Sequence, residues 1–228
     1  MTGIIAAMEA ELSGLRACLE NVTAETISGR TFYSGMLFGK AAVMTVCGIG
    51  KVNAAVCAEA MILRYRPDEI INTGVGGALK KDVKLLDTVV AAYAVQHDAD
   101  TTALGDPKGM VSTVNLIRFP TDSALNSRLI DAIGTAGGHA VSGGVATGDQ
   151  FVNSAEAKAA IVKEFDCAAC DMEGASIAQV CYLNSVKCAI LRSISDGADE
   201  DANLSYTRFM ELAAANSVKA IKSYLVSR

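Results

Sequence analysis

The sequence predicts an α/β fold, with one domain over residues 1–228 and a mixed, mostly parallel central sheet flanked by helices. Apolar strands alternate with helical patterns along the chain, and this alternation is typical of a parallel sheet covered on both faces. A meander of short strands near the N-terminus makes the sheet mixed. The length of 228 residues fits one large domain or two small ones, and no linker or internal repeat divides the chain.

In the first half of the chain, strand and helix patterns follow each other closely. The expected elements are a strand at 1–7, an amphipathic helix at 9–21, a meander at 24–46, a helix at 51–66 and strands at 69–73 and 88–95. The clearest runs of the meander are Thr31–Tyr33 and Ala41–Val46. The helix at 51–66 has one apolar face and ends before Pro67. That face consists of Val52, Val56, Ala60 and Leu63.

The second half opens with an irregular region over residues 98–121, which is long enough to indicate a lid or an interface. The elements expected after it are helices at 121–135, 154–164, 173–184 and 205–226 and strands at 140–147, 167–172 and 187–195. Ser154 is a predicted N-cap, because its side chain can accept a hydrogen bond from the first turn.

Composition excludes several classes of function. The net charge of −5 argues against nucleic-acid binding, and no apolar run is long enough for a membrane span. Acidic residues near the start argue against a signal peptide, so we expect a cytoplasmic protein. Most of the seven cysteines lie in apolar contexts typical of buried thiols. Cys167 and Cys170 form a C-x-x-C within a strand, where neither a redox motif nor a four-ligand zinc site is expected.

Three further motifs resemble known sites but lack residues or spacings that those sites require. Gly48–Lys51 lacks the spacing of a phosphate loop, and Gly74–Leu79 lacks the third glycine of a dinucleotide fingerprint. Both are expected to be tight turns that contact a ligand or pack closely. His97 lies beside two aspartates, which favours a turn held by Asp side chains over a metal site. His139, in a glycine-rich turn, is expected to be exposed. We therefore expect no metal and no cofactor.

Carboxylates follow three of the predicted strands: Glu11, Glu173 and Asp196. Asp and Glu are rarely buried unless they are paired or used, and ligands of α/β sheets bind beyond the carboxyl ends of the strands. A helix N-terminus or a turn would also explain each one singly. As a set, they predict a pocket that handles protons and positive charge.

Seven segments together carry a family resemblance over nearly the whole chain. They are Gly3–Glu11, Gly48–Ala55, Ile71–Gly74, His97–Asp100, Gly148–Val152, Asp171–Glu173 and Arg192–Asp196. In this order and spacing they resemble the 5′-methylthioadenosine/S-adenosylhomocysteine nucleosidases, within the nucleoside phosphorylase and hydrolase superfamily. The resemblance implies that superfamily's α/β fold, a homodimer, and hydrolysis of the N-glycosidic bond of adenine 5′-thionucleosides.

The resemblance also implies roles for individual residues. Glu11 would activate water, Asp196 would protonate N7 of adenine, and Glu173 would bind the ribose hydroxyls. The candidate substrate-binding residues are Met172 at the ribose, Phe151 and Val152 at the base, Met8, Ile49 and Tyr206 at the sugar and 5′ group, and Ser195 and Arg192 beside the acid. Arg192 is expected to position a carboxylate. The chain departs from the family pattern at Val75 and Leu104, which leaves the preferred 5′ group open.

The chemistry supports these roles, because glycoside cleavage passes through an oxocarbenium-like state that anionic groups stabilise. Three alternatives remain. A purine nucleoside phosphorylase would need arginines around phosphate, and the loop after the first strand offers Glu9 and Glu11 but no arginine. An aminodeoxyfutalosine nucleosidase would use the same catalytic groups. A nucleoside-binding protein without catalysis is disfavoured by the presence of all three carboxylates.

Overall fold

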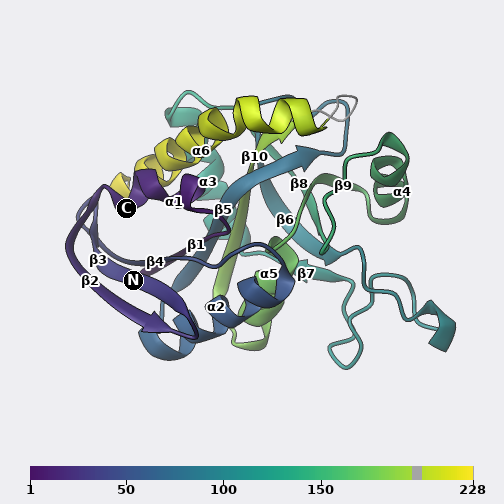
Figure 1. Cartoon of the computed structure of the whole chain (residues 1–228), viewed down its shortest axis with the longest axis horizontal. Helices are drawn as coiled ribbons and strands as arrows, with labels where there is room; N and C mark the ends of the chain where they lie inside the picture. The colour runs from purple at the N-terminus through teal and green to yellow at the C-terminus, as the bar shows by residue number, and fades with distance from the viewer. Residues whose placement is uncertain (197–201, 228) are drawn as a thin grey trace.

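A mixed sheet runs through the molecule, and helices cover both of its faces (Figure 1). The computed structural model describes residues 1–196 and 202–227, and it describes no side chains in 202–209. The strands are β1 (Thr2–Ala6), β2 (Leu19–Ile27), β3 (Arg30–Leu37), β4 (Lys40–Val46), β5 (Glu69–Ala78), β6 (Thr88–Gln96), β7 (Arg118–Pro120), β8 (Ala140–Thr147), β9 (Cys167–Asp171) and β10 (Lys187–Asp196). The helices are α1 (Glu9–Arg16), α2 (Lys51–Tyr65), the short 3-10 helix η1 (Thr102–Leu104), α3 (Ser123–Thr135), α4 (Ala155–Phe165), α5 (Gly174–Leu183) and α6 (Ala202–Val226).

The prediction of a mixed α/β sheet is confirmed. Strand β1 pairs in parallel with β4 and β5, and the predicted meander forms the antiparallel ladder β2–β3–β4. The helix predicted at 9–21 was too long. It ends at Arg16, and Leu19 already begins β2, because pairing with β3 overrides the local helical pattern.

Part of the sheet closes on itself. Strand β10 pairs in parallel with β5 and antiparallel with β6, and the path from β6 continues through β8 and β9 back to β5. Glycines permit this closure, since a Cβ on Gly76 would lie 3.0 Å from the carbonyl oxygen of Cys170. The segment from Gly74 is thus extended strand, and the tight turn predicted there is wrong. The other predicted turn is present, because Gly48 and Gly50 adopt φ values of 87° and 98°.

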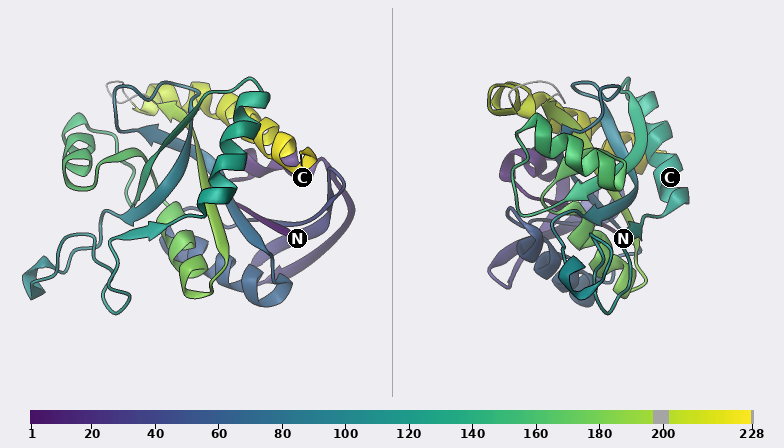
Figure 2. Two further views of the ribbon diagram at one scale, coloured as in Figure 1. Left: turned by 180° about the vertical axis from the view of Figure 1, so that it is seen from behind. Right: turned by 90° about the vertical axis from the view of Figure 1, so that its right-hand side faces the viewer.

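Helices α2 and α5 pack together on one face, and α1, α3 and α6 lie on the other (Figures 1 and 2). Two apolar clusters fill the space between these layers and the sheet. Of the predicted apolar face of α2, only Ala60 packs against this core. Val52, Val56 and Leu63 are 74%, 42% and 66% exposed. The buried residues of α2 are Ala54, Cys57, Ala58, Met61 and Ile62, whose smaller members allow close approach.

Of the irregular region predicted at 98–121, residues 98–117 contain only η1 and an isolated bridge and extend away from the sheet (Figure 2). Residues 118–120 instead form β7, because they pair with β6. The predicted cap of α4 is confirmed. The Ser154 side chain caps α4 by accepting a hydrogen bond from the Ala157 N–H. No helix among the described residues is long and apolar enough to cross a membrane.

Candidate active site

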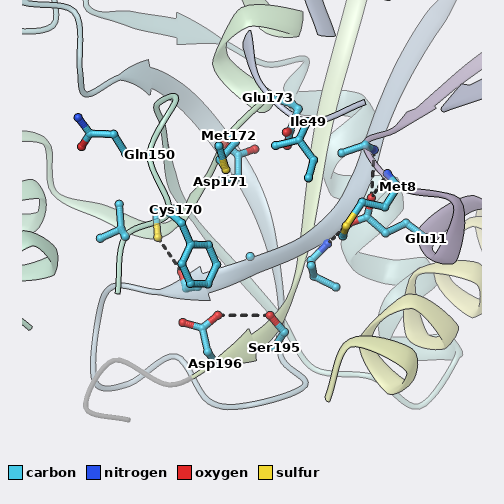
Figure 3. Close-up of a pocket in the computed structure, with 16 residues that line it drawn as sticks. Met8, Glu11, Ile49, Gln150, Cys170, Asp171, Met172, Glu173, Ser195 and Asp196 are labelled. Carbon is cyan, nitrogen blue, oxygen red and sulfur yellow. Dashed lines mark hydrogen bonds between the residues drawn. The ribbon is translucent and has the colours of Figure 1, made fainter. Parts of the chain in front are cut away.

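A pocket that is open to solvent on one side lies at the carboxyl ends of β1, β5, β9 and β10 (Figure 3). It is lined by Ala7, Met8, Glu11, Ile49, Val75, Gly76, Gly77, Gln150, Phe151, Val152, Cys170, Asp171, Met172, Glu173, Ser195 and Asp196. Concave and mostly apolar sites with a few polar groups bind small molecules. Four carboxylates and no lysine or arginine belong to this lining, so an anionic ligand is disfavoured.

Glu11 enters the pocket from the first turn of α1 and is held by three backbone donors. The N–H groups of Ala7 and Met8 donate to Oε2 at 3.0 and 2.9 Å, and that of Val75 donates to Oε1 at 2.9 Å. Gly74 leaves room for the carboxyl group, because a Cβ there would lie 2.7 Å from Oε1. Burial raises the pKa of Glu11, although the backbone donors and Arg192 oppose the shift. A carboxylate that is fixed and more basic than usual is suited to accept a proton.

Glu173 follows β9 and shares a buried arginine with Asp171. Arg192 forms an ion pair with Asp171 and lies 3.9 Å from Glu173 Oε2. The N–H of Gly50 donates to Glu173 Oε1 at 2.9 Å. Burial and the negative charge of Asp171 raise the pKa of Glu173 to about 7, against the opposing effects of Arg192 and the Gly50 N–H. The carboxyl group therefore changes charge in the neutral range, where it can either accept or donate a hydrogen bond to a bound hydroxyl.

Asp196 ends β10 on a different side of the pocket from Glu11 (Figure 3). Its side chain is 4% exposed and pairs with Lys158, whose Nζ lies 3.3 Å from Oδ2. The hydroxyl of Ser195 donates to Oδ1 at 3.3 Å. A Cβ on Gly77 would lie 3.0 Å from Oδ2, so the glycine gives the carboxyl group its space. Two oxygens with separate partners fix the orientation of this group.

Apolar side chains surround the carboxylates and form the walls of the pocket. Phe151 and Ile49 are 50% and 53% exposed, and Met8, Val152 and Met172 also line the pocket. Half-exposed apolar groups beside buried carboxylates can bind a planar ring and an alkyl substituent.

A polar network joins the turn at Gly48–Gly50 to the loop before Phe151. Lys51 Nζ lies 2.6 Å from Asp98 Oδ1, and the Lys51 N–H donates to Asp149 Oδ1 at 2.8 Å. The Asp149 N–H in turn donates to Asp98 Oδ2 at 2.9 Å. The Asp98 side chain thus joins Lys51, at the start of α2, to Asp149 in the loop before Phe151. Asp100 accepts two hydrogen bonds from Thr102 in the predicted turn. No group of potential metal ligands occurs in the described part of the chain.

Most of the predicted site residues meet in this pocket, with two exceptions. Arg192 is 1% exposed and lies beneath the pocket, where it contacts the carboxylates of Asp171 and Glu173 as expected. Tyr206 belongs to α6, but its side chain lies outside the described residues. Leu104 is 84% exposed on η1 and does not line the pocket of its own chain.

Sequence reasoning did not assign a role to Asp171 or Lys158. Asp171 belongs to the segment Asp171–Glu173, one of the seven that carry the family resemblance. Its ion pair with Arg192 depends on the pairing of β5 with both β9 and β10. The sequence does contain an indication of a role for Lys158, because this lysine shares the buried face of α4 with Ile161 and Phe165. A lysine at an apolar helix position needs a partner.

The cysteines conform to the expectation of buried thiols. Six of the seven are buried and all are free, and the exception is Cys18. Cys170 lines the pocket, but burial raises its pKa and that of Cys167 to about 12. Both thiols are therefore protonated and unreactive at neutral pH. His139 is exposed as expected, and its Nδ1 lies 2.9 Å from Asp87 Oδ1.

Comparison with known proteins agrees with this geometry. The sequence model of the phosphorylase superfamily matches residues 2–226. A 5′-methylthioadenosine/S-adenosylhomocysteine nucleosidase of Exiguobacterium is 41% identical over 96% of this chain and 94% of its own. An aminodeoxyfutalosine nucleosidase of Helicobacter pylori is 38% identical over 97% of this chain and 96% of its own.

Solved structures give the same picture. The Neisseria meningitidis 5′-methylthioadenosine/S-adenosylhomocysteine nucleosidase in complex with methylthio-immucillin-A has a TM-score of 0.95 and 39% identity, covering 100% of this chain and 99% of that one. Futalosine hydrolase of Helicobacter pylori has a TM-score of 0.94 and 36% identity, covering 100% and 97%.

Proposed function

Since the chain belongs to the phosphorylase superfamily and its relatives are nucleosidases, we propose that it hydrolyses the N-glycosidic bond of 5′-methylthioadenosine and S-adenosylhomocysteine. The products are adenine and the corresponding 5-thioribose. The observation that carries the proposal is the convergence of Glu11, Glu173 and Asp196 on one pocket without a cationic lining residue. No cofactor is required for this reaction.

Glu11 is the proposed general base. A water molecule attacks C1′ of the ribose and transfers a proton to the Glu11 carboxylate. The three backbone donors keep this carboxylate in place, and its raised pKa improves it as a base. A negative group beside the sugar also stabilises the oxocarbenium-like transition state.

Asp196 is the proposed general acid. Asp196 is ion-paired with Lys158 in the free site and first takes up a proton. This O–H bond breaks as an N–H bond forms at N7 of adenine. The electron pair of the bond from C1′ to N9 moves into the purine, which departs as neutral adenine. Without this proton the leaving group would carry a negative charge, so acid assistance is worth roughly 10²–10⁴-fold.

The remaining lining residues are assigned to the parts of the nucleoside. Glu173 accepts hydrogen bonds from the ribose hydroxyls, and Met172 packs against the sugar. Phe151 stacks on adenine, and the Val152 backbone contacts its edge. Met8 and Ile49, with Tyr206 from α6, surround the sugar and 5′ group, while Ser195 and Arg192 orient Asp196 and Glu173. Apart from Arg192 and Tyr206, these residues line the pocket, and the contacts of Ser195 and Arg192 with the two carboxylates support their roles. The role of Tyr206 rests on the family resemblance alone.

A hydrolase rather than a phosphorylase is supported by the charge of the site. Phosphate would approach four carboxylates, and Arg192 is already paired with Asp171 beneath them. We expect adenine release from 5′-methylthioadenosine in phosphate-free buffer, with an unchanged rate after phosphate is added. The assay follows adenine by chromatography with S-adenosylhomocysteine in parallel. A strict phosphate requirement would overturn the hydrolase assignment, and no turnover by folded protein under either condition would favour a nucleoside-binding role.

An aminodeoxyfutalosine nucleosidase is the second candidate, because relatives with that name are as similar to this chain as the thionucleoside hydrolases are. The catalytic groups would be the same, and only the 5′ substituent differs. Inclusion of aminodeoxyfutalosine in the assay ranks the three substrates by kcat/KM. A preference for it above a factor of about ten, or 1.4 kcal/mol, would make it the principal substrate.

We further propose that the protein is cytoplasmic and acts in methionine salvage. Each chain forms one domain, and two chains form a homodimer. The free buried thiols suit a reducing compartment. The exposed apolar face of α2 borders a surface groove, and monomers rarely expose such a patch without a partner. The groove is lined by Glu25, Ile27, Ser28, Ala55, Val56, Glu59, Ala60, Leu63, Arg64 and Val180.

A charge in the middle of this face is expected to split the dimer. In Leu63→Glu, a carboxylate would have to be buried against the partner subunit, so the mass in sedimentation equilibrium should fall from two chains to one. Val226→Glu, also at an exposed apolar residue but at the end of α6, is the matched control. A Leu63→Glu protein that remains dimeric would place the interface elsewhere, and a monomeric wild type would refute the dimer.

A further inference from the structure

Helix α4 delivers a buried lysine to the proposed acid. The side chains of Lys158 and Asp196 are each 4% exposed, and Lys158 Nζ lies 3.3 Å from Asp196 Oδ2. Lysine is almost never buried to this extent without a charged partner. No other ion pair of a lysine in the described residues is as deeply buried as this one.

Helix α4 begins directly after a segment that lines the pocket. Its N-cap, Ser154, comes directly after the loop that supplies Phe151 and Val152 to the lining. One turn into the helix, Lys158 points to the same side as Ile161 and Phe165, which pack against β8 and β9. The element that forms the wall for the base thus also supplies a cation for the acid.

This cation matters for the proton transfer. When Asp196 gives its proton to adenine, a negative charge develops on a carboxyl group that water reaches poorly. A fixed positive charge 3.3 Å away stabilises this charge in the transition state. The same contact occupies Oδ2, while Ser195 donates to Oδ1, so the carboxyl group cannot rotate freely.

We propose that Lys158 is a positioning residue for leaving-group protonation, which holds Asp196 by Oδ2 and stabilises the carboxylate that remains after the proton is transferred to the base. The inference rests on the proposed function, in which Asp196 is the acid. If the ion pair only supported the fold of α4, its loss would change the rates on substrates with different leaving groups to the same extent.

The test compares two substrates on one protein preparation. 5′-Methylthioadenosine needs a proton on its leaving group, whereas the 4-nitrophenyl glycoside of 5-methylthioribose releases a stable anion. The variants are Lys158→Met, which keeps the length and removes the charge, and Lys158→Arg, which keeps the charge. Lys163→Met, at an exposed lysine of the same helix, is the matched control.

We expect Lys158→Met to lose roughly tenfold to a hundredfold in kcat on 5′-methylthioadenosine, up to the lower end of the range for general acid assistance. The rate on the 4-nitrophenyl glycoside should be retained, Lys158→Arg should recover most of the loss, and Lys163→Met should behave as wild type. Equal losses on both substrates, or no loss on either, would overturn the proposal. Failure of the wild-type protein to cleave 5′-methylthioadenosine would instead refute the proposed function.

Discussion

Replacement of Asp196 by Asn is expected to lower kcat on 5′-methylthioadenosine by about 10³-fold or more, within the upper half of the range for general acid assistance. Asn has nearly the shape of Asp but carries no acidic proton, so adenine would have to leave as an anion. The amide oxygen can still accept a hydrogen bond from Lys158, and the fold should persist. Steady-state adenine release, together with thermal unfolding of both proteins, measures the two effects.

The leaving group again provides the sharpest control. Asp196→Asn should cleave the 4-nitrophenyl glycoside at close to the wild-type rate, because that anion needs no proton. Asp166→Asn replaces an exposed aspartate that pairs with Lys80 on the surface, and it should leave both rates unchanged. Near-normal release of adenine by Asp196→Asn would remove the acid assignment.

Replacement of Glu11 by Gln is expected to lower kcat on both substrates by about 10²–10⁴-fold. The amide cannot accept the proton of the attacking water. Its NH₂ group would also face a backbone donor, because N–H groups approach both oxygens of Glu11. Parallel assays on the two substrates separate this variant from Asp196→Asn, since the water must be activated whatever the leaving group.

Glu9→Gln is the matched control, because Glu9 lies in the same helical turn and pairs with Arg16 on the surface. It should retain full activity. Binding of adenine, measured by calorimetry, should persist in Glu11→Gln, which shows that the pocket is intact. A Glu11→Gln protein with unchanged kcat would mean that another group activates the water.

Much of the fold was readable from the sequence because the relevant signals are local. The strand at Ala140–Thr147 and the cap at Ser154 were predicted at the positions where they occur. The three carboxylates at strand ends also predicted the pocket, since parallel strands deliver their carboxyl ends to one edge. The helix at 9–21 was overextended, because pairing of β2 with β3 is not encoded in that segment alone.

The alternation of strands and helices and the residue types at the strand ends can be read from the local sequence. The closure of the sheet by β10 between β5 and β6, which places Arg192 beneath Asp171 and Glu173, depends on long-range packing. The same holds for the outward orientation of Leu63 on α2 and for the contact of Lys158 on α4 with Asp196. The physical reason is that periodicity reports the shape of each element, whereas the partner of a buried charge depends on which distant elements pack together.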